Sequence, residues 1–150
     1  MKIILYQPDI AGNLGAVMRS CACFGLSLDI IEPCGFPLTA KSLKRTAMDY
    51  GSPESLTRHN SWQAFSDQPR TGRLVLLTTK ATTRLPDFKF QAEDQLLFGR
   101  ESAGVPDDMH AAVDARITIP MAKNKRSLNL AASVSITIYE ALRQTGGLPR

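Results

Sequence analysis

The residue types best suited to chemistry stand near the end of the chain, where a cationic loop joins two apolar segments. Ile117–Ile119 is typical of a short buried strand, and Leu128–Gln144 is typical of a long helix. The loop Met121–Arg126 carries three cations, and Ser127–Asn129 places polar side chains where the helix begins. A helix start has unpaired N–H groups that such side chains, or a ligand, can satisfy. The segment therefore predicts a ligand site beside a site for a polyanion.

Two further polar clusters follow predicted strands. In the first, Asn13 lies between glycines and is a good helix N-cap, and Arg19 follows within the helix. An N-cap explains Asn13 fully, and a surface arginine with its stem on apolar neighbours is the simpler interpretation of Arg19. In the second cluster, Phe98–Pro106 is a loop with two glycines and a charged pair. Ligands in open α/β sheets lie outside the carboxyl ends of strands, although many such loops are only turns.

Short apolar runs alternate with helical segments along the chain. The runs that predict strands are Lys2–Tyr6, Leu28–Ile31, Leu74–Thr78, Gln95–Phe98 and Ile117–Ile119, with Ser55–Thr57 as a brief further candidate. The segments that predict helices are Asn13–Phe24, Thr39–Met48, Ser61–Ser66, Pro106–Val113 as a helical turn, and Leu128–Gln144, while Arg84–Gln91 is expected as a loop or edge piece. Continuous apolar strands between helices favour an α/β fold, with a parallel sheet covered by helices on both faces. We expect residues 1–150 to form one domain.

The last predicted helix, Leu128–Gln144, is apolar nearly all round, with Leu, Val and Ile at successive faces. A helix of this kind is buried on more than one side. In so small a chain, the second side is either a partner subunit or the centre of the subunit itself. For a dimer, we expect this helix and Asn13–Phe24 to form the contact.

Charge favours a polyanionic partner without proving one. The chain has 150 residues and a formal net charge of +4, from 18 Lys and Arg against 14 Asp and Glu. Basic domains often bind nucleic acid, but a slightly basic protein with no such role remains open.

Several classes of chemistry lose support from what the sequence lacks. The three cysteines are odd in number and the two histidines, His59 and His110, lie far from them, so neither a disulfide scaffold nor a metal site is expected. Glycine motifs for dinucleotides and for ATP phosphates are missing, as is a nucleophile elbow. The apolar run at the N-terminus is too short for a signal peptide, and no stretch approaches a membrane span. We therefore expect a soluble, cytoplasmic protein.

Taken in order, three motifs resemble the SPOUT superfamily of RNA methyltransferases, in its 2′-O-methylating SpoU branch. They are Asn13–Arg19, Phe98–Pro106 and Ile119–Leu130, and together they span almost the whole chain. The minimal length, with Ile31–Pro33 and Asp49–Tyr50 between the motifs, is most similar to the TrmL-type members of that branch. Arg100 departs from their pattern, in which a small or proline-like residue precedes the glutamate.

The resemblance implies a trefoil-knotted α/β fold, a homodimer, and S-adenosylmethionine as the methyl donor. TrmL-type enzymes methylate the ribose of the wobble nucleotide, a cytidine or modified uridine at position 34, in leucine tRNAs. The expected partners are therefore tRNA and a second copy of the chain, with no metal and no membrane.

The resemblance also assigns roles to residues. Arg19 is the implied catalytic residue, which holds the ribose–phosphate and stabilises the developing alkoxide, or acts as a base if its pKa is strongly perturbed. Tyr139 is a second catalytic candidate, with an aromatic core filler as the alternative, and Asn129 orients the ribose or shapes the cofactor loop. The implied cofactor pocket consists of Leu77, Thr78, Gly99, Glu101, Gly104, Ile119, Met121, Ser127 and Leu128. The cations expected to contact RNA are Lys41, Lys44, Arg45, Lys123, Lys125 and Arg126.

Other functions remain open at this stage. Within the family, the alternative to the wobble nucleotide is another ribose of tRNA or a ribose of ribosomal RNA. From another class, a non-catalytic RNA-binding module would keep the cations and lose cofactor binding. A small nucleotide-binding domain of the dinucleotide type is disfavoured, because its glycine spacing is wrong.

Overall fold

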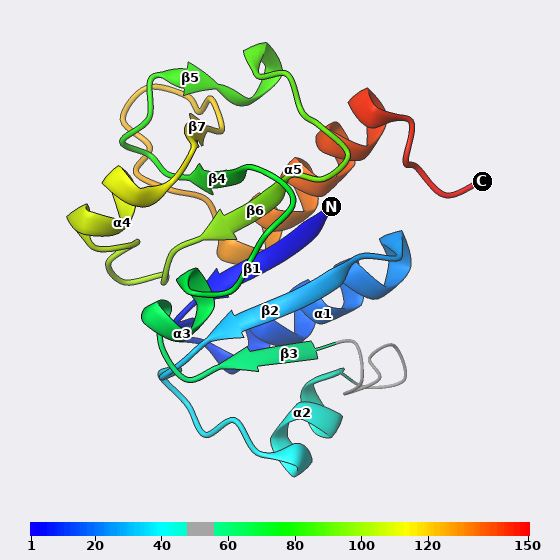
Figure 1. Ribbon diagram of the computed structural model, residues 1–150, viewed down its shortest axis with the longest axis vertical. Coiled ribbons are helices and arrows are strands. Elements are labelled where there is room, and N and C mark those ends of the chain that lie inside the picture. Colours follow the sequence, from blue (N-terminus) through cyan, green and yellow to red (C-terminus); the bar gives the residue numbers. More distant parts are fainter. Residues whose placement is uncertain (48–55) are drawn as a thin grey trace.

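The computed structural model describes residues 1–47 and 56–150, and in them a seven-stranded sheet has the order β3-β2-β1-β6-β4-β7-β5 (Figure 1). The strands are β1 (Lys2–Tyr6), β2 (Ser27–Ile31), β3 (Leu56–His59), β4 (Leu74–Leu77), β5 (Thr83–Arg84), β6 (Gln95–Phe98) and β7 (Ala115–Thr118). The helices are α1 (Ala11–Phe24), α2 (Ala40–Ala47), α3 (Trp62–Ser66), α4 (Asp107–Ala112) and α5 (Leu130–Thr145), with a 3-10 turn, η2, at Leu85–Asp87. Each pairing between neighbouring strands is parallel.

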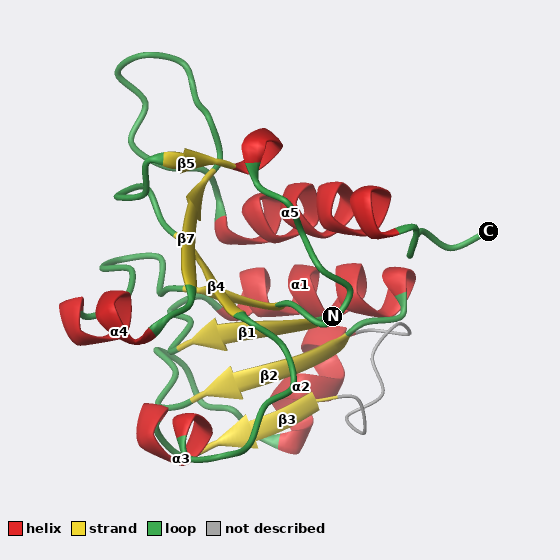
Figure 2. Ribbon diagram, turned by 45° about the horizontal axis from the view of Figure 1, so that its top comes forward, coloured by secondary structure: helices red, strands yellow, loops and turns green. Residues whose placement is uncertain are grey.

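Both faces of the sheet are apolar, because side chains alternate along each strand. Ile3 and Leu5 of β1 belong to the core under α1, α2 and α5, whereas Ile4 between them belongs to the core under α3 and α4. Figure 2 shows these two sets of helices on opposite sides of the sheet. The prediction of a parallel sheet covered on both faces is confirmed. The knot itself is not decided by strand order and remains a prediction.

The strand order places a crevice where the ligand was expected. β6 lies between β1 and β4, although β2 to β5 intervene in sequence, so the direction of strand addition reverses there. The carboxyl ends of β1, β6, β4 and β7 consequently meet at one edge of the sheet. A reversal of this kind is where open α/β sheets bind ligands.

Several predicted boundaries shift for identifiable reasons. α1 begins at Ala11 rather than Asn13, and α5 begins at Leu130 because Asn129 is its N-cap. β7 starts two residues earlier than predicted, since Ala115 pairs with Val75 of β4. Met48 and Ser55, the predicted ends of one helix and one strand, lie outside the described residues, as do Asp49 and Tyr50.

An ion pair with a buried carboxylate connects the residues that precede β4 and β6. The carboxylate of Asp94 is fully buried and accepts bonds from Arg73 Nε at 2.9 Å, Arg73 Nη2 at 2.8 Å and the Gln91 N–H at 2.8 Å. Arg73 stays partly exposed, so its guanidinium keeps some contact with water. This geometry makes Asp94 an acceptor for three donors just before β6 begins.

We predict that Asp94→Ala lowers the free energy of unfolding by about 2–3 kcal/mol, because bonds from charged groups are the strong ones and their donors lose an acceptor. The matched control is Asp87→Ala, whose 3.7 Å contact with Arg84 joins two exposed side chains. An exposed pair of this kind is worth less than about 1 kcal/mol. Urea denaturation measures both variants, and equal midpoints would contradict the role given to the buried pair.

Candidate functional site

A cavity of about 460 Å³ opens at the carboxyl ends of β4, β6 and β7. Its walls come from residues 76–79 and 98–105, from Thr118, Ile119 and Met121, and from the segment that leads into α5. The structure brings together in this one cavity all nine residues expected around a cofactor, namely Leu77, Thr78, Gly99, Glu101, Gly104, Ile119, Met121, Ser127 and Leu128. That they contact a cofactor stays a prediction.

The loop after β6 is a tight ring that needs a glycine at each end. Arg100 and Gly104 exchange backbone bonds, with N···O distances of 3.1 and 2.8 Å. A Cβ on Gly99 would lie 2.5 Å from the Gly104 carbonyl carbon, so only glycine fits without a shift. Gly104 has φ +67°, a left-handed conformation that favours glycine. The ring thus presents residues 99–104 to the cavity in one conformation.

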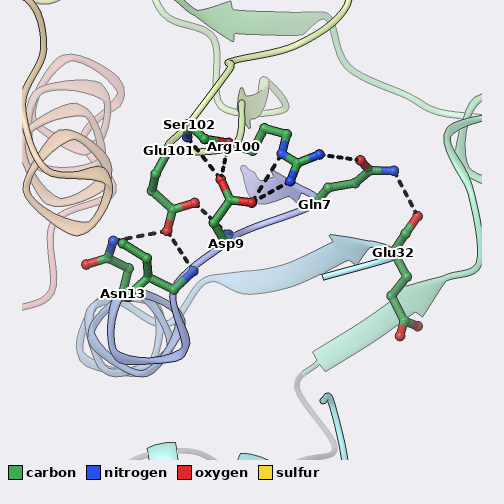
Figure 3. A network of polar contacts seen from close by, with 8 residues as sticks. Gln7, Asp9, Asn13, Glu32, Arg100, Glu101 and Ser102 are labelled. Atoms are coloured by element: carbon green, nitrogen blue, oxygen red, sulfur yellow. Dashed lines mark hydrogen bonds and ion pairs between the residues drawn. The ribbon is translucent and has the colours of Figure 1, made fainter. Parts of the chain in front are cut away.

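Glu101 turns out of this ring toward the start of α1 (Figure 3). The residue before α1, Ile10, has no capping side chain, and the first turn of the helix holds no acid. Glu101 Oε2 accepts the Asp9 N–H at 2.7 Å, and Oε1 accepts the Ile10 N–H at 3.3 Å and the Asn13 side-chain amide at 3.0 Å. The prediction that Asn13 is the N-cap is wrong: the N-cap is Ile10, and Asn13 lies in the first turn, where its side-chain amide donates to Glu101.

Asn13 continues the connection to α5. Its Oδ1 accepts from Asn129 Nδ2 at 2.9 Å, and Asn129 Oδ1 accepts from the Ala132 N–H at 3.2 Å to cap α5. Further along the same two helices, the hydroxyls of Ser20 and Ser135 are 2.9 Å apart. The three motifs predicted to act together are thus joined by a continuous set of hydrogen bonds. Asn129 uses one donor and its acceptor oxygen to hold Asn13 and the start of α5, which supports the role of shaping the loop.

The other two catalytic candidates lie away from the cavity of their own chain. Arg19 is exposed on α1 and is not among the residues that line the cavity. Tyr139 is 53% exposed on α5, so the alternative of a core filler is wrong. It borders a separate apolar groove, together with Phe24, Leu85 and Ile136. One chain therefore does not bring Arg19 and Tyr139 to the place where the cofactor is expected.

The six predicted RNA-binding cations are exposed, in two separate clusters. Lys123, Lys125 and Arg126 lie in the loop between β7 and α5, beside the cavity. Lys41, Lys44 and Arg45 lie on α2, at the opposite end of the molecule (Figure 1). The structure places the first cluster, and not the second, next to the expected site of chemistry.

Sequence reasoning left several cavity residues unassigned. Ile10, Asn13, Ser102 and Ser133 all line the cavity. Asn13 and Ser102 stood inside the quoted motifs, and Ser133 follows Asn129 by one helical turn, so spacing offered a clue to three of the four. Nothing in the local pattern marked Ile10, which reaches the cavity because α1 begins one residue after it.

Two of the three cysteines are poorly suited to nucleophilic chemistry, and the described residues offer no cluster for a metal ion. Burial raises the pKa of Cys21 to about 12 and that of Cys34 to about 11, which keeps both thiols protonated. Among residues 1–47 and 56–150, no cluster of His, Cys, Asp and Glu is suited to a metal ion. Nor does any helix in these ranges have the length and apolar character to span a membrane.

The chain is similar to known proteins over nearly its full length. It is 49% identical to the tRNA (cytidine(34)-2'-O)-methyltransferase of Beijerinckia indica subsp. indica, over 99% of this chain and 94% of the relative. A solved structure, described as giving insights into the 2-OH methylation of C/U34 on tRNA, superposes with TM-score 0.87 at 40% identity, covering 95% of this chain and 94% of the other.

A more distant structure carries the expected cofactor. The SpoU methyltransferase AviRb from Streptomyces viridochromogenes, in complex with AdoMet, has TM-score 0.78 and 27% identity over 96% of this chain and 57% of its own. The model of the SpoU rRNA Methylase family matches residues 1–139. With its parallel sheet, its cavity at the carboxyl ends of β4, β6 and β7, and these matches, the chain belongs to the SpoU rRNA methylase family.

Proposed function

We propose that this chain transfers a methyl group from S-adenosylmethionine to the ribose 2′-hydroxyl of nucleotide 34 in tRNA, with leucine tRNAs as substrates. The observation that carries the proposal is near full-length similarity to relatives of that name, together with a cavity lined by all three motifs. The leucine specificity rests on the resemblance of the motifs alone. Since the substrate would be a tRNA, the cytoplasm is the proposed location.

The cavity suits a nucleoside cofactor. Its volume lies within the usual range for small-molecule sites, and its walls combine apolar side chains with strand-end backbone groups. The side chains of Glu101, Asn13 and Asn129 are already committed to each other and to helix starts. Backbone groups of the ring and of the strand ends are therefore left to read the adenine and ribose. When bound, S-adenosylmethionine supplies an electrophilic methyl group on a sulfonium, so no metal is required.

The chain has to position the ribose hydroxyl and manage its proton. A hydroxyl is a weak nucleophile, and its attack depends on in-line placement and on help with the departing proton. A guanidinium is too basic to serve as an ordinary base, but it holds phosphate and stabilises a developing alkoxide. We assign these tasks to Arg19, with Tyr139 beside the RNA. Lys123, Lys125 and Arg126 would hold the RNA backbone at the mouth of the cavity.

A homodimer reconciles these roles with the exposed positions of Arg19 and Tyr139. Tyr139 and Ile136 are large side chains left 53% and 42% exposed on α5, beside an apolar groove. Cover by a second copy would bury Ile136, leave Tyr139 at the edge of the contact next to the RNA, and provide the second apolar side that the α5 sequence predicts. We infer that α1 and α5 form this contact, and that each cavity is completed by Arg19 of the other copy.

A non-catalytic RNA-binding module and another ribose target are the remaining alternatives, and one set of measurements separates them. We predict that calorimetry shows binding of S-adenosylmethionine but not of NAD or ATP, and that unmodified leucine tRNA is methylated at position 34. Binding of tRNA without binding of S-adenosylmethionine would favour the module. Methylation at another nucleotide would show that the proposed target is wrong and that the proposed reaction, ribose 2′-O-methylation, is right.

We predict that Arg19→Ala abolishes methyl transfer but retains cofactor binding, because a guanidinium would repel the sulfonium rather than hold it. If Arg19 acts across a dimer, mixing this variant with the cavity variant Gly99→Val restores about a quarter of wild-type activity. Random exchange gives half heterodimers, each with one complete site. Turnover of Arg19→Ala at the wild-type rate would refute the role. No recovery in mixtures that sediment as heterodimers would place Arg19 in the site of its own chain.

We predict that Lys123→Ala with Lys125→Ala weakens tRNA binding and flattens its salt dependence, by up to about one unit of slope per lost phosphate contact. Affinity for S-adenosylmethionine should barely move. The control is Lys89→Ala with Arg150→Ala, which removes two exposed cations outside both clusters. Salt titrations that superimpose for wild type and the Lys123 and Lys125 variant would show that these lysines only keep the loop soluble.

A further inference from the structure

We infer that Asp9 and Arg100 are positioning residues for the cofactor. The ion pair between these two side chains fixes the ring 99–104 in the conformation that forms the cavity wall. The inference rests on the proposed function, because it assumes that S-adenosylmethionine occupies this cavity. Neither residue is needed to explain the fold of the sheet. Arg100 is also the position at which the chain departs from the TrmL-type motif, in which a small or proline-like residue precedes the glutamate.

Both carboxylate oxygens of Asp9 accept hydrogen bonds from residues of the ring (Figure 3). Its Oδ1 accepts from Arg100 Nη2 at 2.6 Å and from Arg100 Nε at 3.2 Å. Its Oδ2 accepts from the Ser102 N–H at 2.9 Å and from the Ser102 hydroxyl at 2.7 Å. One side chain thus fixes two ring residues, on either side of Glu101.

Asp9 and Glu101 make a reciprocal exchange between two segments that are about ninety residues apart in sequence. Asp9, in the turn after β1, accepts from the ring, while Glu101, in the ring, accepts from the turn and from Asn13. Each acid therefore needs the other segment in place. The exchange couples the cavity wall to the start of α1, the helix that carries Arg19.

Asp9 is on the rigid side of this exchange. A Cβ on Gly35 would lie 2.9 Å from both Cα and O of Asp9, and the Gly35 N–H donates to the Pro8 carbonyl at 2.9 Å, so the turn is packed against a second loop. Gln7 has φ +44° and donates its N–H to Ile31 of β2 at 2.8 Å. Its side chain accepts from Arg100 Nη1 at 3.4 Å. The end of β1 therefore offers the ring a support that is itself held by a second loop and by β2.

The electrostatics fit a permanent pair. The Arg100 guanidinium and the Ser102 hydroxyl lower the pKa of Asp9 to about 2, and Asp9 in turn raises the pKa of Arg100. Both groups are consequently charged at any pH used for assay. Residues 98–105 line the cavity and Asp9 does not, so Asp9 acts on a ligand only through the ring.

The test is a double-mutant cycle on cofactor affinity, with Asp9→Asn, Arg100→Met and both together, in the full chain. We expect each single variant to raise the calorimetric Kd for S-adenosylmethionine roughly tenfold, since each removes hydrogen bonds to a charged group. The double variant should bind no more weakly than either single one. KM for S-adenosylmethionine should rise in parallel, while kcat at saturating cofactor stays within about twofold of wild type. Arg100→Lys, which keeps the charge and one donor, should restore part of the affinity.

Arg58→Met is the matched control. Arg58 makes an equivalent two-pronged pair with Glu32, at 2.7 and 3.0 Å, at the ends of β2 and β3 and away from the cavity. It should shift the thermal midpoint about as much as Arg100→Met and leave the Kd unchanged. Unchanged Kd values in the Asp9 and Arg100 variants, additive losses in the double variant, or an equal loss in Arg58→Met would each overturn the inference. Absence of binding by the wild-type chain would instead refute the proposed function.

Discussion

The carboxylate of Glu101 at the start of α1 is the interaction on which the geometry of the site depends. α1 has neither a capping side chain at Ile10 nor an acid in its first turn to face the positive end of its dipole. The carboxylate of Glu101, from the loop after β6, brings a negative charge there and accepts the N–H groups of Asp9 and Ile10, which lead into the helix. One carboxylate therefore sets both the entry of the helix that carries Arg19 and the orientation of the ring that lines the cavity.

The pairing of polar side chains within the protein limits which groups of the site can bind a ligand. Several polar side chains at the crevice are paired within the protein: Glu101 with the segment that leads into α1, Asp9 with the ring, and Asn13 with Asn129. Polar groups paired in this way are rigid, and they offer little to an incoming ligand. The cavity still presents backbone groups, apolar side chains and the hydroxyls of Ser127 and Ser133, a mixture that suits a nucleoside. The exposed cations of the loop between β7 and α5 lie beside it, where an RNA backbone would pass.

The sequence predicted well what depends on local pattern, and poorly what depends on distant partners. Apolar runs such as Leu74–Leu77 identified buried parallel strands, because covering both faces leaves no polar alternation. The resemblance of the three motifs to a known family predicted nine residues around one ligand, and the structure places all nine in one cavity, where parallel strands bring their carboxyl ends to one edge. The start of α1 was misplaced because its N-cap, Ile10, has no capping side chain that would mark it in the sequence. Arg100 looked like a mere departure from a motif, since its partner, Asp9, becomes visible only when β1 and β6 pair.

The same contrast applies to α5, and it bears on the assembly. Its composition predicts burial on more than one side, yet Ile136 and Tyr139 remain exposed on a chain taken singly. A hydrophobic pattern reports the environment in which the sequence functions, and that environment includes any partner subunit. The position of Arg19 also needs an explanation, because a residue expected to act on the substrate is exposed on α1 and does not line the cavity. The proposed packing of α1 and α5 against a second copy would resolve both problems at once, since the contact that covers Ile136 would also offer Arg19 a neighbouring cavity.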